Sequence, residues 1–489
     1  MSKLKYKKNI DQNRYESKAH RVLIKNFRFH SVKSTSIEGH TDLNKNLSEH
    51  FSTDNYSYLP NFPILITSDK VPWEICTLYL LAKIESDGKY EPRTIRGIAD
   101  HLLDYLRFLE EEKLSYLHFP ENNLLKVTYR YRSRLIEQMS YGEISPSAAK
   151  FRINAVVKFY KEIVDWKLID PEQIKNTPFE NTTKLISISS SHGARIPLKI
   201  MSHNLVIKVP KKQRDPEYIN DGGDLRPLTT REQELMLTAL KFSSREYQLM
   251  FYLALFTGAR IQTIGTLRVK HIQRALDQYE NLRLPIGHGT EIDTKYGKNM
   301  TLQIPGWLVK DMLIYSRSPE AQKRRQRSFY GDTDENYLFL SKNGIPYYTS
   351  RKEIIDKGRR EDPKDNKGFG SLRITALQDG AALRQHIHAI LMPRIKLENP
   401  EFQKFKFHDL RASFGMNLLE SQLQIRGNDN ITAALDYTQQ RMGHSSKQTT
   451  LQYLNYKSRL EWRKTIQHEF ESNLFMYINT SNPVSATYV

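Results

Sequence analysis

Apolar residues recur with helical spacing over two long segments, and this periodicity constrains the fold more than any other feature of the sequence. The first apolar face comprises Ile95, Ile98, Ala99, Leu102, Leu106 and Leu109, and the second comprises Ile153, Val156, Val157, Tyr160, Ile163 and Val164. Spacing of i, i+3, i+4 and i+7 is typical of an amphipathic helix, whereas a strand would alternate with a period of two. Residues 66–175 are therefore predicted to form a small helical domain.

Residues 227–489 show a different organisation. A buried apolar helix is predicted over residues 247–256, because nearly all of its positions are apolar. Strand-like pieces follow at 281–286 and 300–305, and the Gly and Asn residues between them are typical of turns in a hairpin. The last part of the chain is mostly helical in pattern. The fold class expected is mainly α with a small antiparallel β-sheet in this second domain (α+β).

Two other segments lack sustained periodicity. Residues 1–65 are polar and rich in Lys, Asn, Ser and His, which predicts a basic N-terminal arm that is partly irregular and orders on a partner. Residues 176–226 carry Pro, Gly, Ser and charge, which is typical of a linker with at most a short strand. Lys211, Lys212 and Arg214 make this linker basic, as would suit a connector that lies across DNA.

The charge of the chain indicates a polyanionic partner. Lys plus Arg is 74 and Asp plus Glu is 55, so the formal net charge is 74 − 55 = +19. Nucleic acid is favoured over a membrane, because no apolar run approaches the roughly 20 residues that span a bilayer. The chain starts with basic residues, but the apolar stretch of a secretory signal does not follow them, so no such signal is expected. A single cysteine, Cys76, excludes a disulfide scaffold and a zinc module with several cysteines. The expectation is a soluble, cytoplasmic, DNA-associated protein.

Four short motifs carry the candidate chemistry, in the order TGAR, TKYGK, HDLR and GHSS followed by a tyrosine. Their reactive residues are Arg260, Lys295, Lys298, His408, Arg411, His444 and Tyr453. Each has an ordinary structural reading when taken alone: an Arg that caps a helix end, two solvated turn lysines, a surface His–Arg pair and a packing tyrosine. Short motifs such as H-x-x-R also occur by chance. The set in order is therefore more informative than any member.

A site built from two Arg, two His, a Lys and a Tyr suits a phosphodiester in transfer. The set contains no paired carboxylates, nucleophile elbow or Walker loop, which disfavours glycosidase, serine hydrolase and P-loop chemistry. Each guanidinium can hold two phosphate oxygens, which a lysine cannot. A cationic pocket and a nearby base would activate a phenol as the nucleophile. A Lys or His could protonate the leaving 5′ oxygen.

These ordered motifs resemble the tyrosine recombinase (phage integrase) family. The resemblance implies a helical core-binding domain followed by a catalytic domain that carries the site. It also implies the role of each residue. Two arginines and two histidines would surround the scissile phosphate, a lysine would act as general acid, and a tyrosine would form a 3′-phosphotyrosyl link: Arg260, Arg411, His408, His444, Lys295 and Tyr453. Lys298 is the alternative general acid, and Tyr456 is a bystander.

The resemblance further implies a site-specific recombinase that integrates, excises or transposes a mobile element. Its partner would be duplex DNA, bound by a homotetramer on two sites, and residues after about 465 would reach a neighbouring subunit. The need for an accessory directionality factor is left open. No metal or other cofactor is expected, because the phosphotyrosine retains the bond energy. His386 and His388 are expected to be helix residues rather than metal ligands, since no carboxylate pattern lies beside them.

The sequence also departs from the family pattern. Thr263 stands where the family usually has an acid three positions after the first Arg, which puts the ordering around the site in doubt. The interval from Lys295 to His408 is longer than is usual in the family, which implies an insertion around residues 310–400. Three basic residues of the first domain, Arg130, Arg132 and Arg134, and the run Lys323, Arg324, Arg325 and Arg327 each have two readings, a DNA contact or a solvated helix face. Rival functions are a type IB topoisomerase or telomere resolvase, an inactive DNA-binding protein, and an RNA-binding protein.

Overall fold

The computed structural model of the chain describes residues 15–30, 56–88, 90–189, 195–209, 218–360, 377–426 and 430–459. These residues fall into two compact units, one before residue 213 and one after it. Helices dominate both units, and the strands named below form antiparallel pairs. The predicted fold class, mainly α with small antiparallel sheets, is therefore confirmed.

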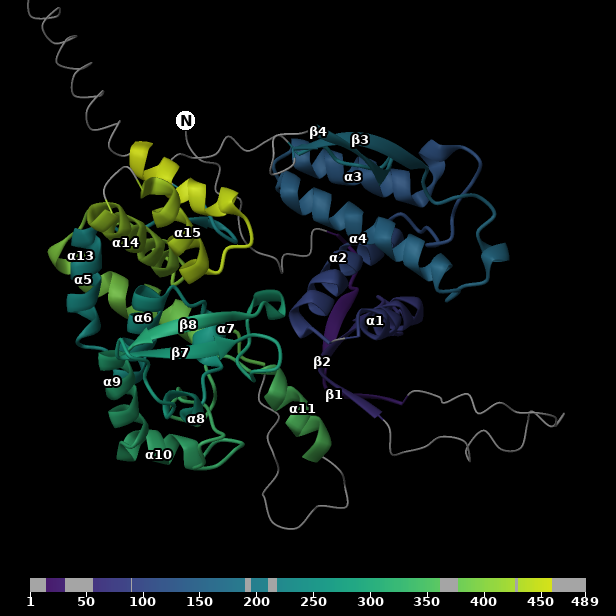
Figure 1. Cartoon of the computed structure of the whole chain (residues 1–489). Coiled ribbons are helices and arrows are strands. Elements are labelled where there is room, and N and C mark those ends of the chain that lie inside the picture. The colour runs from purple at the N-terminus through teal and green to yellow at the C-terminus, as the bar shows by residue number, and fades with distance from the viewer. Residues whose placement is uncertain are drawn as a thin grey trace, which may run out of the picture. The chain divides into compact units, whose positions relative to one another are not determined.

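The first unit is built on helices around one apolar core. Its elements are β1 (His20–His30), β2 (Tyr56–Ile66), α1 (Glu74–Asp87), α2 (Pro92–Glu111), α3 (Val127–Ser140), α4 (Pro146–Asp165), β3 (Asn181–Ser189) and β4 (Arg195–His203), with short 3₁₀ turns at Asn123–Leu125 and Pro171–Gln173 (Figure 1). Helix α4 begins where the Ser145 side chain accepts a hydrogen bond from the Ala148 amide, with Pro146 in the first turn. The apolar faces of α2 and α4 pack against each other.

Two hairpins lie in segments that the sequence did not predict to form long strands. Within the predicted irregular arm, β1 pairs with β2 from His20 opposite Ile66 to His30 opposite Tyr56. The prolines in β2 hid this strand, because proline within a run argues against a strand. Within the predicted linker, β3 pairs with β4 over nine residues each.

Two of the three arginines of α3, Arg130 and Arg134, form ion pairs within the first unit. Arg130 pairs with Glu112, and Arg134 lies 3.8 Å from Glu111 and 3.3 Å from Glu137. These ion pairs favour the reading of a solvated, charge-paired helix face over that of a phosphate contact.

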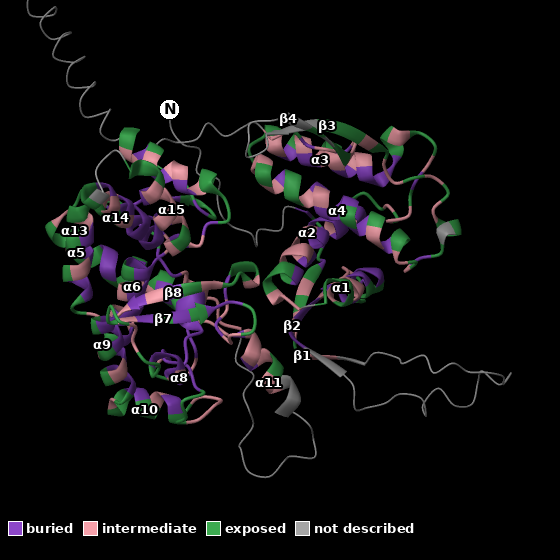
Figure 2. Ribbon diagram, in the orientation of Figure 1, coloured by how far each residue is buried: buried purple, intermediate pink, exposed green. Residues whose placement is uncertain are grey.

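The second unit surrounds the buried helix α6. Its elements are β5 (Ile219–Asn220), β6 (Asp224–Leu225), α5 (Thr230–Leu240), α6 (Arg245–Thr257), α7 (Ile261–Gly265), α8 (Val269–Ile272), β7 (Asn281–Ile286), β8 (Met300–Pro305), α9 (Gly306–Ser316), α10 (Pro319–Gln326), α11 (Arg351–Arg360), α12 (Ala381–His386), α13 (Met392–Glu398), α14 (Asp409–Arg426) and α15 (Ile431–Met442). A π-helical turn, Ile387–Leu391, joins α12 to α13, and residues 447–459 are also helical. Figure 2 shows the buried residues gathered along α6 and the hairpin of β7 and β8.

The hairpin of β7 and β8 forms as its sequence pattern predicts. Asn281 pairs with Pro305 and Ile286 pairs with Met300. Leu282, Leu284 and Ile286 are buried and alternate with residues that face outward. The two strands thus hold the turn between them, which carries Lys295.

The basic run of α10 stabilises the fold from within. Arg324 lies 2.7 Å from Glu246, and Arg325 lies 2.6 Å from Asp332. Arg327 donates a hydrogen bond to the carbonyl of Lys342. The three arginines of this run therefore bind other parts of the second unit, which neither of the two sequence readings anticipated.

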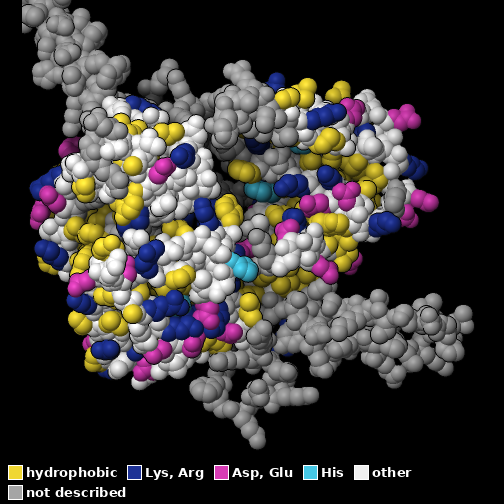
Figure 3. All heavy atoms as spheres, viewed as in Figure 1, with side chains coloured by type: hydrophobic (Ala, Val, Ile, Leu, Met, Phe, Trp, Pro, Cys, Tyr) yellow, Lys and Arg dark blue, Asp and Glu magenta, His cyan; other side chains and the backbone are white. Residues whose placement is uncertain are grey.

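The surface of the described residues mixes both signs of charge. In the face shown by Figure 3, Lys and Arg side chains are spread over both units with Asp and Glu side chains among them. Among the helices that the structure describes, none has the length and apolar content to cross a membrane.

Candidate active site

Arg260 follows the end of helix α6 and reaches a cluster of polar side chains. The helix ends at Gly258, whose φ of 67° is left-handed and suits a residue without a Cβ. A Cβ there would lie 2.5 Å from the ring of Phe414, so the turn is also tightly packed. The Nη2 atom of Arg260 lies 3.2 Å from Oδ1 of Asp221. Its Nε is buried without a hydrogen-bond partner, which leaves a donor for a bound anion.

Arg411 is the most buried cation of the site, with 2% of its surface exposed. It lies in the first turn of α14, and its Nε donates to Oδ2 of Asp221 at 2.7 Å. Its other two nitrogens donate to the carbonyls of Gly258 at 2.7 Å and Met442 at 2.6 Å. These carbonyls end helices α6 and α15, where the helix dipole favours a positive charge. Arg411 therefore joins two helix ends and fixes its guanidinium by three hydrogen bonds.

Both predicted histidines contact the same aspartate. His408 lies in the turn directly before α14, and its Nε2 donates to the backbone carbonyl of Asp221 at 3.2 Å. Gly443 ends helix α15, and the loop after it carries His444. The Nε2 atom of His444 lies 3.0 Å from Oδ2 of Asp221, and its Nδ1 lies 3.0 Å from Oγ1 of Thr450.

Tyr453 is fully buried on the helical segment 447–459, and its hydroxyl donates to Oδ2 of Asp221 at 3.2 Å. Its ring packs against α14 at Gly415, where a Cβ would lie 2.4 Å from the ring. Only glycine allows this approach. Tyr456 is also buried and belongs to the same apolar cluster as Tyr453. The phenol of residue 453 is therefore held inside the site of its own chain.

The two candidate lysines occupy different places. Lys295 lies in the turn between β7 and β8, and a Cβ on Gly222 would lie 3.5 Å from its Nζ and 3.9 Å from Nε2 of His408. Lys298 donates instead to the carbonyl of Gly443 at 2.7 Å. The structure thus brings the amine of Lys295 to the cluster and directs that of Lys298 to the backbone beside His444.

Asp221 is the site residue that sequence analysis missed. It lies in the turn between β5 and β6, within the segment predicted to be a linker, and is 4% exposed. Five of the six predicted side chains contact it: Arg260, Arg411, His408, His444 and Tyr453. The only sequence signal at this position is the Asp-Gly-Gly of a turn, which says nothing about a buried carboxylate.

The charges of the cluster follow from these contacts. Burial acts to raise the pKa of the Asp221 carboxyl, but the hydrogen bond from His444 and the charge of Arg411 hold that pKa well below its ordinary value. Burial, with the charge of Arg411, lowers the pKa of His408 to about 4. Burial and the charge of Asp221 raise the pKa of Tyr453 well above its ordinary value. At neutral pH the site therefore holds a carboxylate, a neutral His408 imidazole and a protonated phenol.

Thr263 supports the lysine turn although it lacks the family's carboxylate. Its Oγ1 donates to the carbonyl of Asp293 at 3.1 Å, and the amide of Asp293 donates to Oγ1 of Thr266 at 3.0 Å. Two threonines of α7 and its C-terminal end thus hold the backbone two residues before Lys295. The hydroxyl groups of Thr263 and Thr266 therefore fix the backbone close to Lys295.

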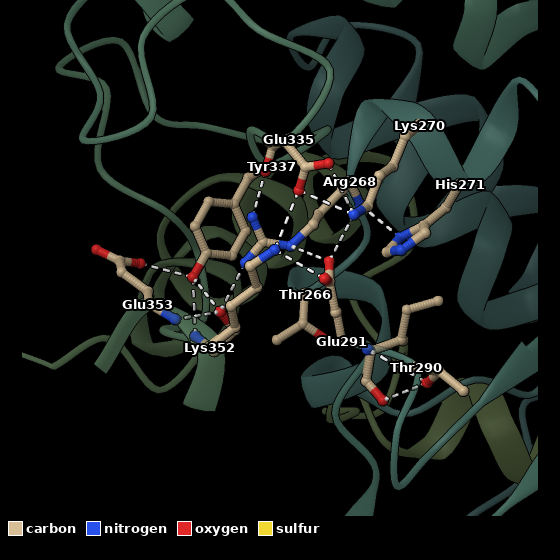
Figure 4. A network of polar contacts seen from close by, with 12 residues as sticks. Thr266, Arg268, Lys270, His271, Thr290, Glu291, Glu335, Tyr337, Lys352 and Glu353 are labelled. Atoms are coloured by element: carbon tan, nitrogen blue, oxygen red, sulfur yellow. Dashed lines mark hydrogen bonds and ion pairs between the residues drawn. The ribbon is translucent and has the colours of Figure 1, made fainter. Parts of the chain in front are cut away.

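A second polar network, centred on Glu291 in the segment between β7 and β8, is shown in Figure 4. Glu291 lies 2.8 Å from Nζ of Lys270 and 2.7 Å from Nζ of Lys352. The amide of Arg351 donates to Asp293 at 3.0 Å. Because Lys352 and Arg351 begin helix α11, the predicted insertion helps to position the turn that carries Lys295.

The described residues give no support to a metal site. His386 lies 2.9 Å from the hydroxyl of Ser243 and stacks on the ring of Tyr247, with 3.9 Å between ring centroids. His388 is exposed. Within the described ranges, no group of three His, Cys, Asp or Glu side chains is arranged to hold a metal ion.

Comparisons with known proteins identify similar folds only. No family model and no curated protein matches the chain. The Tn1549 transposon integrase in complex with circular-intermediate DNA is 14% identical, with 78% of this chain and 94% of that chain covered and a TM-score of 0.41. XerH recombinase bound to difH is 16% identical, with coverages of 77% and 80% and a TM-score of 0.42.

A lambda integrase dimer bound to a COC′ core site is 14% identical, with coverages of 78% and 94% and a TM-score of 0.38. These solved structures are tyrosine recombinases and integrases, the family that the motifs around Arg260, Arg411 and Tyr453 resemble.

Proposed function

We propose that this protein is a site-specific DNA recombinase that cleaves and rejoins strands through a 3′-phosphotyrosyl intermediate. One observation carries the proposal: two guanidiniums, an imidazole and a phenol all contact a single buried carboxylate. The contacts to Asp221 are 3.2 Å from Arg260, 2.7 Å from Arg411, 3.0 Å from His444 and 3.2 Å from Tyr453. A carboxylate and a phosphodiester each carry one negative charge, so the same groups suit the scissile phosphate.

In the proposed reaction, Arg260 and Arg411 bind the non-bridging oxygens and stabilise the charge of the transition state. The Tyr453 oxygen attacks phosphorus and one of the two imidazoles takes the phenol proton. The bond from phosphorus to the 5′ oxygen breaks, and Lys295 protonates that oxygen. A 5′ hydroxyl of a second duplex then attacks the phosphotyrosine and restores the phenol. No metal or nucleotide is required.

Duplex DNA is the proposed partner, bound by a homotetramer on two sites, in the integration, excision or transposition of a mobile element. A type IB topoisomerase or telomere resolvase would use the same chemistry. Relaxation of a supercoiled plasmid by the protein alone would favour that alternative, whereas strand exchange between two duplexes supports the recombinase. Convergence of the whole reactive set argues against an inactive DNA-binding protein.

The test of the proposal is covalent trapping on DNA. Duplexes from the DNA that flanks the gene, nicked close to the cleavage position, lose the short released strand and prevent rejoining. We expect the protein to form an adduct that survives denaturation and that peptide mapping assigns to residue 453. RNA duplexes of the same sequence serve as competitors. Binding to these duplexes with no adduct on any nicked one would contradict the proposed enzyme activity and leave a DNA-binding protein.

Replacing Lys295 with Ala is expected to slow strand cleavage by about 10²-fold or more, a typical contribution of general-acid catalysis. A substrate with a sulfur in place of the bridging 5′ oxygen needs no proton on its leaving group. This substrate should restore the rate of the variant. Lys298→Ala is the matched control, because its amine contacts the backbone at Gly443. Sulfur rescue of Lys298→Ala, with none of Lys295→Ala, would reverse the assignment.

A further inference from the structure

The centre of the site is already filled by a part of the chain that the proposed chemistry does not use. Oδ2 of Asp221 accepts hydrogen bonds from Arg411 at 2.7 Å, His444 at 3.0 Å and Tyr453 at 3.2 Å. The backbone of Gly222 lies beside the amine of Lys295. The donors that Arg411 Nε, His444 and Tyr453 would offer to a phosphate are therefore occupied by this turn, so a phosphate can bind them only after the carboxylate leaves.

The turn is anchored at both ends and free of side chains at its tip. Ile219 and Leu225 are buried in the apolar cluster that also contains Tyr453. The amide of Asn220 donates to the side chain of Gln452 at 2.9 Å. Gly222 and Gly223 lie between these anchors. Gly222 has a φ of 74°, and a Cβ on Gly223 would meet nothing within 4 Å. Two glycines allow a short tip to change conformation while its strands stay in place.

We propose that Asp221 is a displaceable mimic of the scissile phosphate that closes the site until DNA binds. This inference rests on the proposed function. The mimic gives the buried guanidinium of Arg411 and the partly buried guanidinium of Arg260 a counter-charge in the absence of DNA, since an unpaired buried charge is strongly destabilising. It also accepts the hydrogen of the phenol and so holds the nucleophile in its unreactive protonated form. Cleavage therefore begins only when a phosphodiester replaces the carboxylate.

The alternative role for Asp221 is that of a general base for Tyr453. The electrostatics disfavour it, because a carboxyl with a strongly lowered pKa is a weak acceptor for the proton of a phenol with a raised pKa. The carboxylate also contacts the two guanidiniums that are proposed to bind the phosphate, whereas a general base would contact the phenol and leave the phosphate position open. The two roles predict opposite effects of substitution.

Asp221→Asn keeps the shape of the side chain and removes its charge. We expect this variant to form the adduct on the nicked duplex at least about tenfold faster than wild type at subsaturating DNA, because a larger fraction of the protein is competent to bind. Asp224→Asn, an exposed acid of the same turn, is the matched control and should cleave like wild type. Slower cleavage by Asp221→Asn than by wild type or by Asp224→Asn would overturn the proposal.

A second measurement needs no activity. Inorganic phosphate is the probe, and the rise in the midpoint of thermal unfolding is the readout. We expect Asp221→Ala, or Asp221→Asn if the alanine variant does not fold, to be stabilised by phosphate more than wild type and Asp224→Asn are. An equal response in all chains would overturn the mimic. If no chain traps DNA but the Asp221 variants gain phosphate binding, the recombinase proposal fails, and Asp221 stands only as an occupant of a phosphate-binding site.

Discussion

Tyr453→Phe is expected to abolish covalent attachment to DNA while leaving the fold and DNA binding in place. The substitution removes one oxygen, whose hydrogen bond in the described structure goes to Asp221 at 3.2 Å. The ring, which packs against Gly415, is kept. Because no other group would supply the attacking oxygen, adduct formation on the nicked duplex should fall below detection. Binding to the same duplex, measured by gel shift, should stay within a few-fold of wild type.

Tyr456→Phe is the matched control, because Tyr456 is buried three residues away in the same apolar cluster. It should trap DNA at the wild-type rate. If Tyr453→Phe still formed the adduct, or if Tyr456→Phe lost it, the nucleophile would be reassigned to Tyr456. Equal loss in both variants, accompanied by a lower free energy of unfolding, would indicate damage to the fold instead.

Arg411→Lys is expected to slow cleavage by about 10²–10³-fold, the usual cost of losing one well-placed donor to a developing charge. Lysine keeps the charge but has no planar fork, so it cannot reach Asp221 and the two helix-end carbonyls together. The carbonyls of Gly258 and Met442 then lose a partner, which should cost about 1–3 kcal/mol of stability each. Single-turnover cleavage and denaturant unfolding measure the two effects.

The matched control for this variant is Arg384→Lys. Arg384 is an exposed arginine that pairs with Asp379 on the surface of the same unit. We expect no change in its cleavage rate and a change in stability of under about 1 kcal/mol. Wild-type cleavage by Arg411→Lys would show that the fork of this guanidinium is not used in the reaction.

Helical periodicity and motif order predicted much of this molecule from the sequence. The long helices α2 and α4 and the hairpin of β7 and β8 follow apolar patterns with periods near 3.6 and 2. The six proposed site residues lie in motifs whose surroundings distinguish them from chance matches. Five of these six contact one residue in the structure, although their catalytic roles stay predictions.

The features that were missed depend on contacts between distant parts of the chain. Asp221 lies 39 residues from Arg260 and 190 from Arg411, and no local pattern marks a carboxylate that is buried by tertiary packing. Strands β1 and β2 pair across a long gap, and the prolines of β2 conceal its pattern. Arg324 and Arg325 read as a charged surface because their acid partners lie elsewhere in the sequence.

The ion pairs that α10 forms with other parts of the second unit reduce the share of the formal charge of +19 that is available to bind DNA. Arg324 and Arg325 are matched by Glu246 and Asp332, so their positive charge is not presented outward. Each DNA phosphate that a protein cation neutralises releases condensed counterions, so the salt dependence of affinity counts only the cations that contact DNA. The steepness with which ionic strength weakens the complex should therefore reflect the smaller set of outward-facing cations, well below the total count of Lys and Arg.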